Sequence, residues 1–288
     1  MEIKNIYSKT TLNNGVEMPV LGLGVYKTRD GAEVENAINY ALNAGYRLID
    51  TASFYANEEG VGKACRSSIF PREDLFVTSK LWLDDQGYKK THIAFERALD
   101  RLKLDYLDLY MIHWPMPDLY IESWKAMEEL YNAGKIRAIG VCNCLPHHIE
   151  SIKEKCEIKP MVLQNEFHPR LVQPDILRYC SENDIQLQAW APLMRGQILD
   201  NNVVATIAQK HHKTAAQVLV RWDLQKGVCT IPKSVHEHRI VENADVFDFE
   251  LSIDEIQQID ALDREERTGA HPDNFLEHFE KKGVFTKS

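Results

Sequence analysis

Short apolar runs alternate with longer amphipathic stretches along the chain, and this rhythm limits the folds that the chain can adopt. Runs rich in Val, Ile, Leu and aromatic residues are typical of strands. The predicted strands are 20–23, 46–50, 75–80, 107–112, 136–141, 162–166, 185–190 and 228–231. Since strands that alternate with helices pair in parallel, we predict an α/β fold with one parallel, eight-stranded sheet.

The stretches between the strands have helical periodicity. In 32–43, Val34, Ile38 and Leu42 fall on one face, and Gly45 follows as a stop signal. The further predicted helices are 91–102, with Ile93, Phe95, Ala98, Leu99 and Leu102 on the buried face, 174–182, which starts at Pro174, and the consecutive pair 201–211 and 214–226. Before the first strand, an Asn-Asn-Gly sequence at 13–15 predicts the turn of a β-hairpin.

Two arrangements of such a sheet compete: a closed (β/α)8 barrel and an open, doubly wound sheet. The open sheet usually carries a glycine fingerprint for a dinucleotide after its first strand. Gly22 and Gly24 begin such a fingerprint, but Lys27 stands where the third glycine should be, and no acidic ribose ligand follows at the expected place. We therefore predict one domain over residues 1–288, a single TIM barrel with an N-terminal β-hairpin and extra C-terminal helices.

The composition narrows the class of protein. With 34 basic and 43 acidic residues the net charge is −9, which disfavours nucleic-acid binding and means that any anion site must gather positive charge locally. No apolar run reaches the roughly 18 residues of a membrane span, and the first residues do not resemble a signal peptide. We therefore expect a cytoplasmic protein with reduced cysteines and neither a membrane nor a nucleic-acid partner.

Polar residues follow successive predicted strands, at the end of a barrel where chemistry takes place. Asp50 ends the second strand, Lys80 the third and His113 the fourth, and Tyr55 follows five residues after Asp50. A charged lysine lowers the pKa of a neighbouring phenol, a carboxylate keeps that lysine charged, and an imidazole can orient a carbonyl. Each residue alone is more often structural, but together they predict a site that protonates a developing oxyanion.

Long motifs around these residues resemble the aldo-keto reductase family, over nearly all of residues 10–275. The motifs are GYRLIDTASFYANEEGVG (45–62), LDLYMIHWP (107–115), GKIRAIGVCN (134–143), QNEFHP (164–169) and IPKSVHEHRIVEN (231–243). The resemblance is greatest to bacterial glyoxal, methylglyoxal and diketogluconate reductases. It implies a monomeric barrel that reduces aldehydes and ketones with NADPH, in which Tyr55 is the general acid, Lys80 and Asp50 tune it, and His113 orients the carbonyl.

A phosphate site is expected after the last strand, where a helix is predicted to open near Glu237. Lys233 and Arg239 bring two cations there, although a solvated surface helix would have the same sequence features. The resemblance implies that the adenosine phosphate of NADPH contacts Lys233, Ser234, Val235, Arg239, Glu242 and Asn243. It further implies contacts to the rest of the cofactor from Cys142, Asn143, Gln164, Trp190, Pro192 and Leu193, with Trp190 stacked on the nicotinamide ring.

Two residues on the cofactor side depart from the family pattern. Cys142 and Ala191 each stand where a serine is usual, so two hydroxyl contacts to the cofactor are expected to be weakened or missing. The substrate pocket is predicted to be walled by Tyr26, Phe54, Trp82, His113 and Trp114, behind short loops that leave an open mouth for a broad range of carbonyl compounds. Residues 276–288 are expected either to close over this mouth or to form a mobile tail.

Other functions account for fewer of the residues described above. Cys142 and Cys144 form a lone Cys-x-Cys without further ligands, and His147-His148 lies in a polar segment, so no metal site is expected. A zinc hydrolase would need several histidines at strand ends, and only His113 is placed there. An NADPH-binding sensor with little turnover is the remaining alternative, because a fold alone does not define a function.

Overall fold

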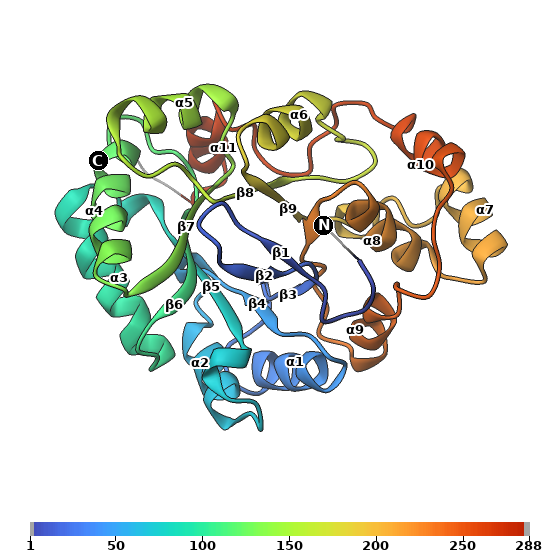
Figure 1. The fold of residues 1–288 in the computed structure, drawn as a ribbon, viewed down its shortest axis with the longest axis horizontal. Coiled ribbons are helices and arrows are strands. Elements are labelled where there is room, and N and C mark those ends of the chain that lie inside the picture. The colour runs from blue at the N-terminus through green and yellow to red at the C-terminus, as the bar shows by residue number, and fades with distance from the viewer. Residues whose placement is uncertain (1–2, 285–288) are drawn as a thin grey trace.

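Eight parallel strands form one sheet, in which they lie in the order of the chain (Figure 1). The computed structural model describes residues 3–284. The sheet closes on itself because the first strand also meets the last: Leu21 bridges Thr230, and the Thr230 N–H donates to the Val20 carbonyl at 3.0 Å. The predicted TIM barrel is therefore confirmed, and the open, doubly wound sheet is excluded.

The barrel strands are β3 (Gly22–Gly24), β4 (Leu48–Asp50), β5 (Phe76–Leu81), β6 (Leu107–Ile112), β7 (Ile136–Cys142), β8 (Val162–Glu166), β9 (Gln186–Trp190) and β10 (Cys229–Thr230). The helices are α1 (Ala32–Asn43), α2 (Glu58–Ser67), α3 (Tyr88–Leu102), α4 (Tyr120–Asn132), α5 (Pro146–Lys155), α6 (Pro174–Glu182), α7 (Asn202–His211), α8 (Ala215–Gln225), α9 (Glu237–Ala244), α10 (Ile253–Asp260) and α11 (Phe275–Lys281). Most of the predicted elements agree with these bounds to within a few residues.

The differences in helix α3 have local causes. The helix begins at Tyr88 rather than at residue 91, because Gly87, with a φ of 107°, lets the chain turn into the helix earlier. The prediction that Ile93 is buried is wrong, since its side chain is 59% exposed. The buried face of α3 runs through Phe95 and Ala98, and a residue two positions before Phe95 points to nearly the opposite side of a helix.

An antiparallel hairpin, β1 (Lys9–Thr11) and β2 (Glu17–Pro19), covers the amino-terminal end of the barrel, across the centre of Figure 1. Its turn contains the predicted Asn-Asn-Gly sequence, with Gly15 at a φ of 85°. Asn13 Nδ2 donates to the Asp184 carbonyl, just before β9, at 2.9 Å. The hairpin thus closes one end of the barrel and leaves the carboxyl ends of the strands for a site.

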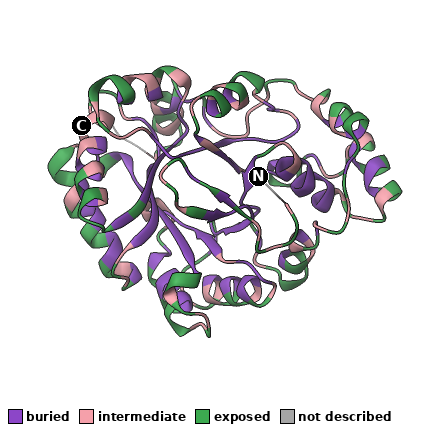
Figure 2. Ribbon diagram, in the orientation of Figure 1, coloured by how far each residue is buried: buried purple, intermediate pink, exposed green. Residues whose placement is uncertain are grey.

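The barrel strands and the inner faces of the helices form one core, whereas the outer helix faces are exposed (Figure 2). Strands β5, β6 and β8 are buried at every position. Several polar side chains nevertheless lie inside the barrel, among them Lys80, Gln164 and Gln188, so each of them needs a partner there. Within residues 3–284, none of the helices is both long enough and apolar enough to cross a membrane.

After α10 the chain returns to the carboxyl ends of the strands and forms α11. Phe275 and Phe279 of this helix pack against Trp114, with ring centroids 5.2 Å away in both cases, and Phe279 also lies 5.6 Å from Trp82. Of the two expectations for residues 276–288, closure over the mouth therefore holds for the residues of α11. Residues 285–288 lie outside the described part of the chain.

Candidate active site

The four predicted catalytic side chains meet at the carboxyl end of the barrel. Asp50 ends β4, Lys80 lies in the neighbouring strand β5, His113 follows β6, and Tyr55 ends a short 3₁₀ turn after β4. Lys80 Nζ donates to Asp50 Oδ1 at 2.5 Å, to the Thr51 carbonyl at 2.9 Å, and to the Tyr55 hydroxyl at 3.4 Å. The lysine ammonium is thus placed between a carboxylate and a phenol, as the sequence predicts.

Lys80 stays charged in this site. Burial by itself would lower the pKa of Lys80, but the adjacent carboxylate of Asp50 more than compensates, and the pKa is raised above its ordinary value. The side chain is fully buried, and its ion pair with Asp50 is buried as well. A cation is therefore fixed beside the Tyr55 hydroxyl.

Two opposing effects set the pKa of Tyr55. Burial raises this pKa well above its ordinary value, and the Lys80 ammonium lowers it, as predicted, but offsets only part of the increase. The residue is half-buried by solvent accessibility, and the sequence could not show which groups surround its ring. Tyr55 is consequently a neutral phenol at physiological pH, and Lys80 acts by stabilising the phenolate once a proton has left.

His113 is a neutral imidazole that faces the same space. Burial lowers its pKa well below the ordinary value, and the charge of Lys80 adds to this effect. Its ring lies 5.6 Å from the Tyr55 ring and 5.1 Å from Trp82, edge to face in both cases. Nδ1 is sealed inside the protein without a hydrogen-bond partner among the described residues, so Nε2 is the nitrogen that can meet a ligand.

Two side-chain amides lie beside these four residues. Gln164 Nε2 donates to Asp50 Oδ2 at 2.8 Å and to Gln188 Oε1 at 2.7 Å. Among residues 3–284, the Cys142 thiol is the one donor to Gln164 Oε1, at 3.6 Å, so this oxygen keeps accepting capacity. Asn143 bonds to protein groups on both sides of its amide, as donor to the His113 carbonyl at 2.9 Å and as acceptor from Trp190 Nε1 at 2.8 Å.

The predicted phosphate site lies across the seam of the barrel. Lys233 bridges Gly24 of the first strand, and Arg239 lies in the first turn of α9, which begins at Glu237 as predicted. Both cations are exposed, and neither lies within ion-pair distance of a carboxylate in the range 3–284, although the charge of Glu33 acts on Lys233. Around them, Ser234 and Asn243 are buried, whereas Val235 is half-buried.

The other predicted cofactor residues are spread along the same edge. Glu242 accepts a hydrogen bond from the Thr214 hydroxyl at 2.8 Å, so its carboxylate is partly used within the protein. Pro192 and Leu193 follow β9, beside Ala191, which has a φ of 52°. This left-handed backbone immediately after Trp190 turns the chain sharply at the strand end.

Aromatic rings form the wall of the site next to His113. Phe54 stacks on Trp82 with ring centroids 3.9 Å apart, and Tyr26 lies 4.9 Å from the Tyr55 ring. Trp114 turns toward α11 and belongs to a small apolar cluster with Trp82 and Phe275. The structure therefore brings the predicted wall residues together, and it adds Phe275 and Phe279, which no motif in the sequence indicated.

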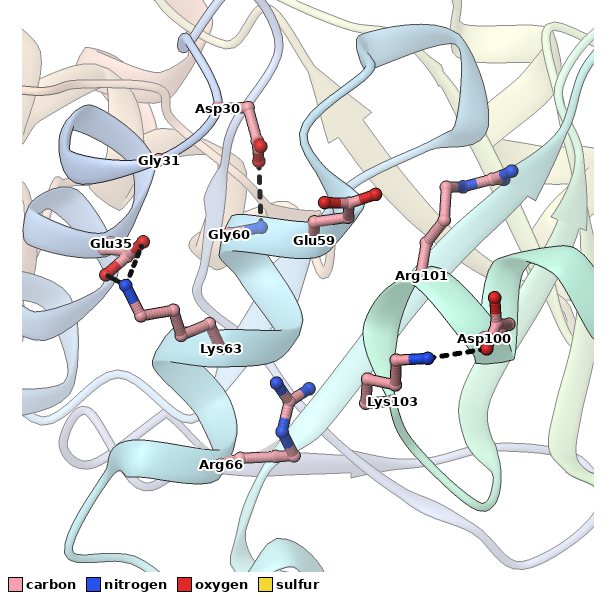
Figure 3. Close-up of a pocket in the computed structure, with 10 residues that line it drawn as sticks. All are labelled: Asp30, Gly31, Glu35, Glu59, Gly60, Lys63, Arg66, Asp100, Arg101 and Lys103. Carbon is pink, nitrogen blue, oxygen red and sulfur yellow. Dashed lines mark hydrogen bonds and ion pairs between the residues drawn. The ribbon is translucent and has the colours of Figure 1, made fainter.

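A separate surface cavity of about 360 Å³ lies between α1, α2 and α3 (Figure 3). Two ion pairs lie among its charged walls, Lys63 with Glu35 and Lys103 with Asp100. It contains none of the four predicted catalytic residues. We therefore place the active site at the barrel mouth and not in this cavity.

One group of side chains among the described residues has the spacing of a metal site: His147, His148 and Asp273, with candidate ligand atoms within 4.8 Å of one another. His148 Nδ1 accepts a hydrogen bond from the Leu145 N–H at 3.1 Å, which leaves the proton of the neutral ring on Nε2, the atom that faces Asp273. We interpret this group as a polar contact between α5 and the chain before α11, since Nε2 of His147 and of His148 lie 3.1 Å and 3.7 Å from Asp273 Oδ1. The expectation of no bound metal stays a prediction.

Comparison with known proteins identifies the family. The model for "Aldo/keto reductase family" matches residues 20–264. The chain belongs to the aldo/keto reductase family. A glyoxal reductase of Bacillus subtilis is 58% identical over 92% of this chain and 96% of its own length, and the methylglyoxal reductase DkgA of Escherichia coli K12 is 45% identical over 92% and 96%.

The aldo/keto reductase fold is also seen in solved relatives. A variant of Gox0644 crystallised with NADPH superposes with a TM-score of 0.89 at 40% identity, covering 94% of this chain and 98% of that one. The resemblance inferred from the motifs is thus confirmed. As a member of this family the protein is an oxidoreductase, and its activity is the reduction of carbonyl compounds.

Proposed function

We propose that the protein reduces small aldehydes and ketones, such as glyoxal and methylglyoxal, to alcohols, with NADPH as the hydride donor and Tyr55 as the proton donor. The observation that carries this proposal is the buried ammonium of Lys80, which contacts Asp50 at 2.5 Å and the Tyr55 hydroxyl at 3.4 Å. A neutral phenol beside a fixed cation suits the protonation of an oxygen on which negative charge develops. The glyoxal and methylglyoxal reductases among its relatives support the substrate class.

The residues present fit NADPH. Lys233 and Arg239 are exposed cations that lie within ion-pair distance of no carboxylate in the described chain, which suits a 2′-phosphate in an acidic protein, and Glu33 acts on Lys233 only from further away. Gln164 Oε1 has accepting capacity left for a carboxamide N–H, and Trp190 offers an indole that Asn143 holds by a 2.8 Å hydrogen bond. When bound, NADPH supplies the hydride that reduces the carbonyl carbon.

Side chains of the protein then orient the carbonyl group and donate the proton. His113 Nε2 orients the carbonyl oxygen toward the Tyr55 hydroxyl, whose proton passes to this oxygen as the alcohol forms. The phenolate that remains is stabilised by Lys80, which Asp50 and the Thr51 carbonyl hold in place. Water restores the proton of Tyr55 for the next cycle.

The packing of α11 over the barrel mouth narrows the expected substrate range. Short loops favoured an open pocket, but Phe275 and Phe279 of α11 narrow the approach beside Trp82 and Trp114. We infer that small carbonyl compounds are preferred to bulky ones. That the protein works in the cytoplasm and as a monomer also remains part of this proposal, and its unpaired, mostly buried cysteines are compatible with a reducing compartment.

The test is Tyr55→Phe, compared with Tyr110→Phe as the control. Tyr110 is a fully buried tyrosine of β6 that packs against Phe95, away from the mouth. We expect Tyr55→Phe to lower kcat for methylglyoxal by about 100-fold or more while the Kd for NADPH stays within a few fold. A kcat within a few fold of the wild type would reject Tyr55 as the proton donor. NADPH binding without turnover on a broad aldehyde panel would favour the sensor.

A further inference from the structure

Glu166, the last residue of β8, lies beneath the cofactor side of the site and has no part in the chemistry described above. Its carboxylate is buried and accepts from four donors. Oε1 accepts from the Thr268 N–H at 2.7 Å, the Thr268 hydroxyl at 2.5 Å and His168 Nε2 at 3.2 Å, and Oε2 accepts from the Gly269 N–H at 3.2 Å. A carboxylate so surrounded fixes the backbone of a segment about 100 residues further along the chain.

This segment, residues 267–270, is called the strap here. It has a second attachment, since Arg267 Nη2 donates to Gln173 Oε1 at 3.0 Å, and Gln173 Nε2 in turn donates to the Glu166 carbonyl at 2.6 Å. Glu166 thus holds the strap directly through its side chain and indirectly through its backbone. The strap leads into α11, so it connects the cofactor side of the mouth to the aromatic substrate wall.

Gly269 of the strap lies against the indole of Trp190. A methyl group at Gly269 would come within 2.6 Å of Trp190 Cη2 and 3.3 Å of Glu166 Oε2, so only glycine fits at this distance. At Nε1 the indole is also fixed by a 2.8 Å hydrogen bond to Asn143 Oδ1. Asn143 and the strap therefore both restrict how the Trp190 ring can move.

We propose that Glu166 is a positioning residue for the reaction: by holding the strap against Trp190, it sets the plane on which the nicotinamide ring stacks. This proposal rests on the function proposed above. A ring held at the right depth brings its C4 within reach of the carbonyl beside Tyr55 and His113, whereas an indole that can tilt allows the nicotinamide to tilt with it. Small misplacements of this kind slow a transfer step strongly.

The experiment compares Glu166→Gln, Gly269→Ala and a matched control, Glu255→Gln. An amide at 166 must turn its NH₂ toward at least one of the donors and releases the strap, and a methyl at 269 pushes the indole. Glu255 is also a buried carboxylate with several donors, Lys210, His211 and the Ser252 N–H, but it lies at the start of α10, away from the mouth. Thr268→Val, which loses only the hydroxyl bond, gives a graded variant if the others do not fold.

The measurements are the Kd for NADPH, kcat and the primary isotope effect with NADPH deuterated at C4. For Glu166→Gln and Gly269→Ala we expect the Kd to rise and kcat to fall by about tenfold each, and the isotope effect to increase because hydride transfer becomes slower than the other steps. Thr268→Val should change the same quantities in the same direction by about twofold to threefold. Glu255→Gln should lower Tm without changing them.

Two results would overturn the proposal. One is an isotope effect and an NADPH Kd that stay at wild-type values in both strap variants. The other is an equal change in Glu255→Gln, which would mean that loss of stability alone explains the effect. Failure of the proposed function is a separate outcome, because it would appear as a wild-type protein that does not bind NADPH or as an active Tyr55→Phe variant.

Discussion

Gln164 Nε2 donates a hydrogen bond of 2.8 Å to Asp50 Oδ2, on the side of the carboxylate opposite to Lys80. Both oxygens of Asp50 are therefore bound by buried donors. The second acceptor for Gln164 Nε2, Gln188 Oε1 at 2.7 Å, fixes which end of the amide faces Asp50. The cofactor side of the site and the catalytic carboxylate are thereby joined through one side chain.

Gln164→Glu should disable the site through charge repulsion. The substitution places a second carboxylate next to Asp50, and like charges at this distance cannot both be ionised. We expect kcat to fall by at least about tenfold, with a larger loss at high pH than at low pH. Gln217→Glu is the control, because Gln217 Nε2 also donates to an aspartate, Asp245, at 3.1 Å, but in α8. An equal loss of kcat in the two variants would contradict the prediction.

The reduction of the carbonyl compound and the oxidation of the alcohol should depend differently on pH. Burial raises the pKa of Tyr55 above its ordinary value, so the phenol keeps its proton to higher pH than free tyrosine does. Reduction needs this proton, and its kcat/KM should be flat from about pH 6 to about pH 9. Oxidation of the alcohol by NADP+ needs the phenolate and should rise with pH over the same range. A loss of reduction near neutral pH would show that a group of lower pKa donates the proton.

Arg239→Gln should affect NADPH much more than NADH. Arg239 has no ion-pair partner in residues 3–284, and the 2′-phosphate is the charge that distinguishes the two cofactors. We expect KM for NADPH to rise by about tenfold and KM for NADH to change by less than about twofold. Arg178→Gln, which removes another exposed arginine, in α6, should change neither. Equal effects on both cofactors would reject the phosphate site.

Phe279→Ala should widen the substrate range. Phe279 closes the mouth against Trp82 and Trp114, so its removal admits larger ketones. The ratio of kcat/KM for a bulky aromatic ketone to that for methylglyoxal should rise by about tenfold, with KM for NADPH unchanged. Phe249→Ala, which removes a half-buried ring near His211, is the control. An unchanged ratio would mean that α11 does not limit access.

Glu255 should contribute to acid stability. Burial alone would raise its pKa, but hydrogen bonds from Lys210, the Ser252 N–H and His211 lower it to about 2. A carboxyl whose pKa is lower in the folded than in the unfolded state stabilises the fold at pH values above its unfolded-state pKa. This contribution is lost as the pH falls through the folded-state pKa. We expect wild type to lose on the order of 3 kcal/mol through this group between about pH 5 and pH 2. The difference in free energy of unfolding between wild type and Glu255→Gln, measured by urea unfolding, should shrink over that range. A difference that stays constant would contradict the assignment.

Local pattern was sufficient for most of the fold. Apolar runs separated by amphipathic stretches predicted every barrel strand, and the Asn-Asn-Gly turn predicted the hairpin. Ile93 was misplaced because a run of apolar residues in a helix does not by itself define which face is buried. The prediction of a closed barrel rested on the incomplete glycine fingerprint. In the structure, the bridge between Leu21 and Thr230 shows directly that the sheet is closed.

The site was predictable where chemistry depends on residue type and strand position. Asp50, Lys80 and His113 lie at or next to the ends of neighbouring strands, so their convergence could be expected. The raised pKa of Tyr55 could not, because it depends on burial by groups distant in sequence. The same holds for Glu166 and Phe279, whose partners lie about 100 and 200 residues away. No spacing rule connects such pairs.

The seam of the barrel also has a consequence for folding. Gly24, in the first strand, donates through its N–H to the Pro232 carbonyl, next to Lys233, and its Cα lies so close to Ile231 that a Cβ would come within 2.8 Å of the carbonyl oxygen. The proposed phosphate site is thus completed only when the two ends of the sheet have met. A chain in which these strands have not met would lack it, so recovery of NADPH affinity during refolding would report the joining of the first strand to the eighth.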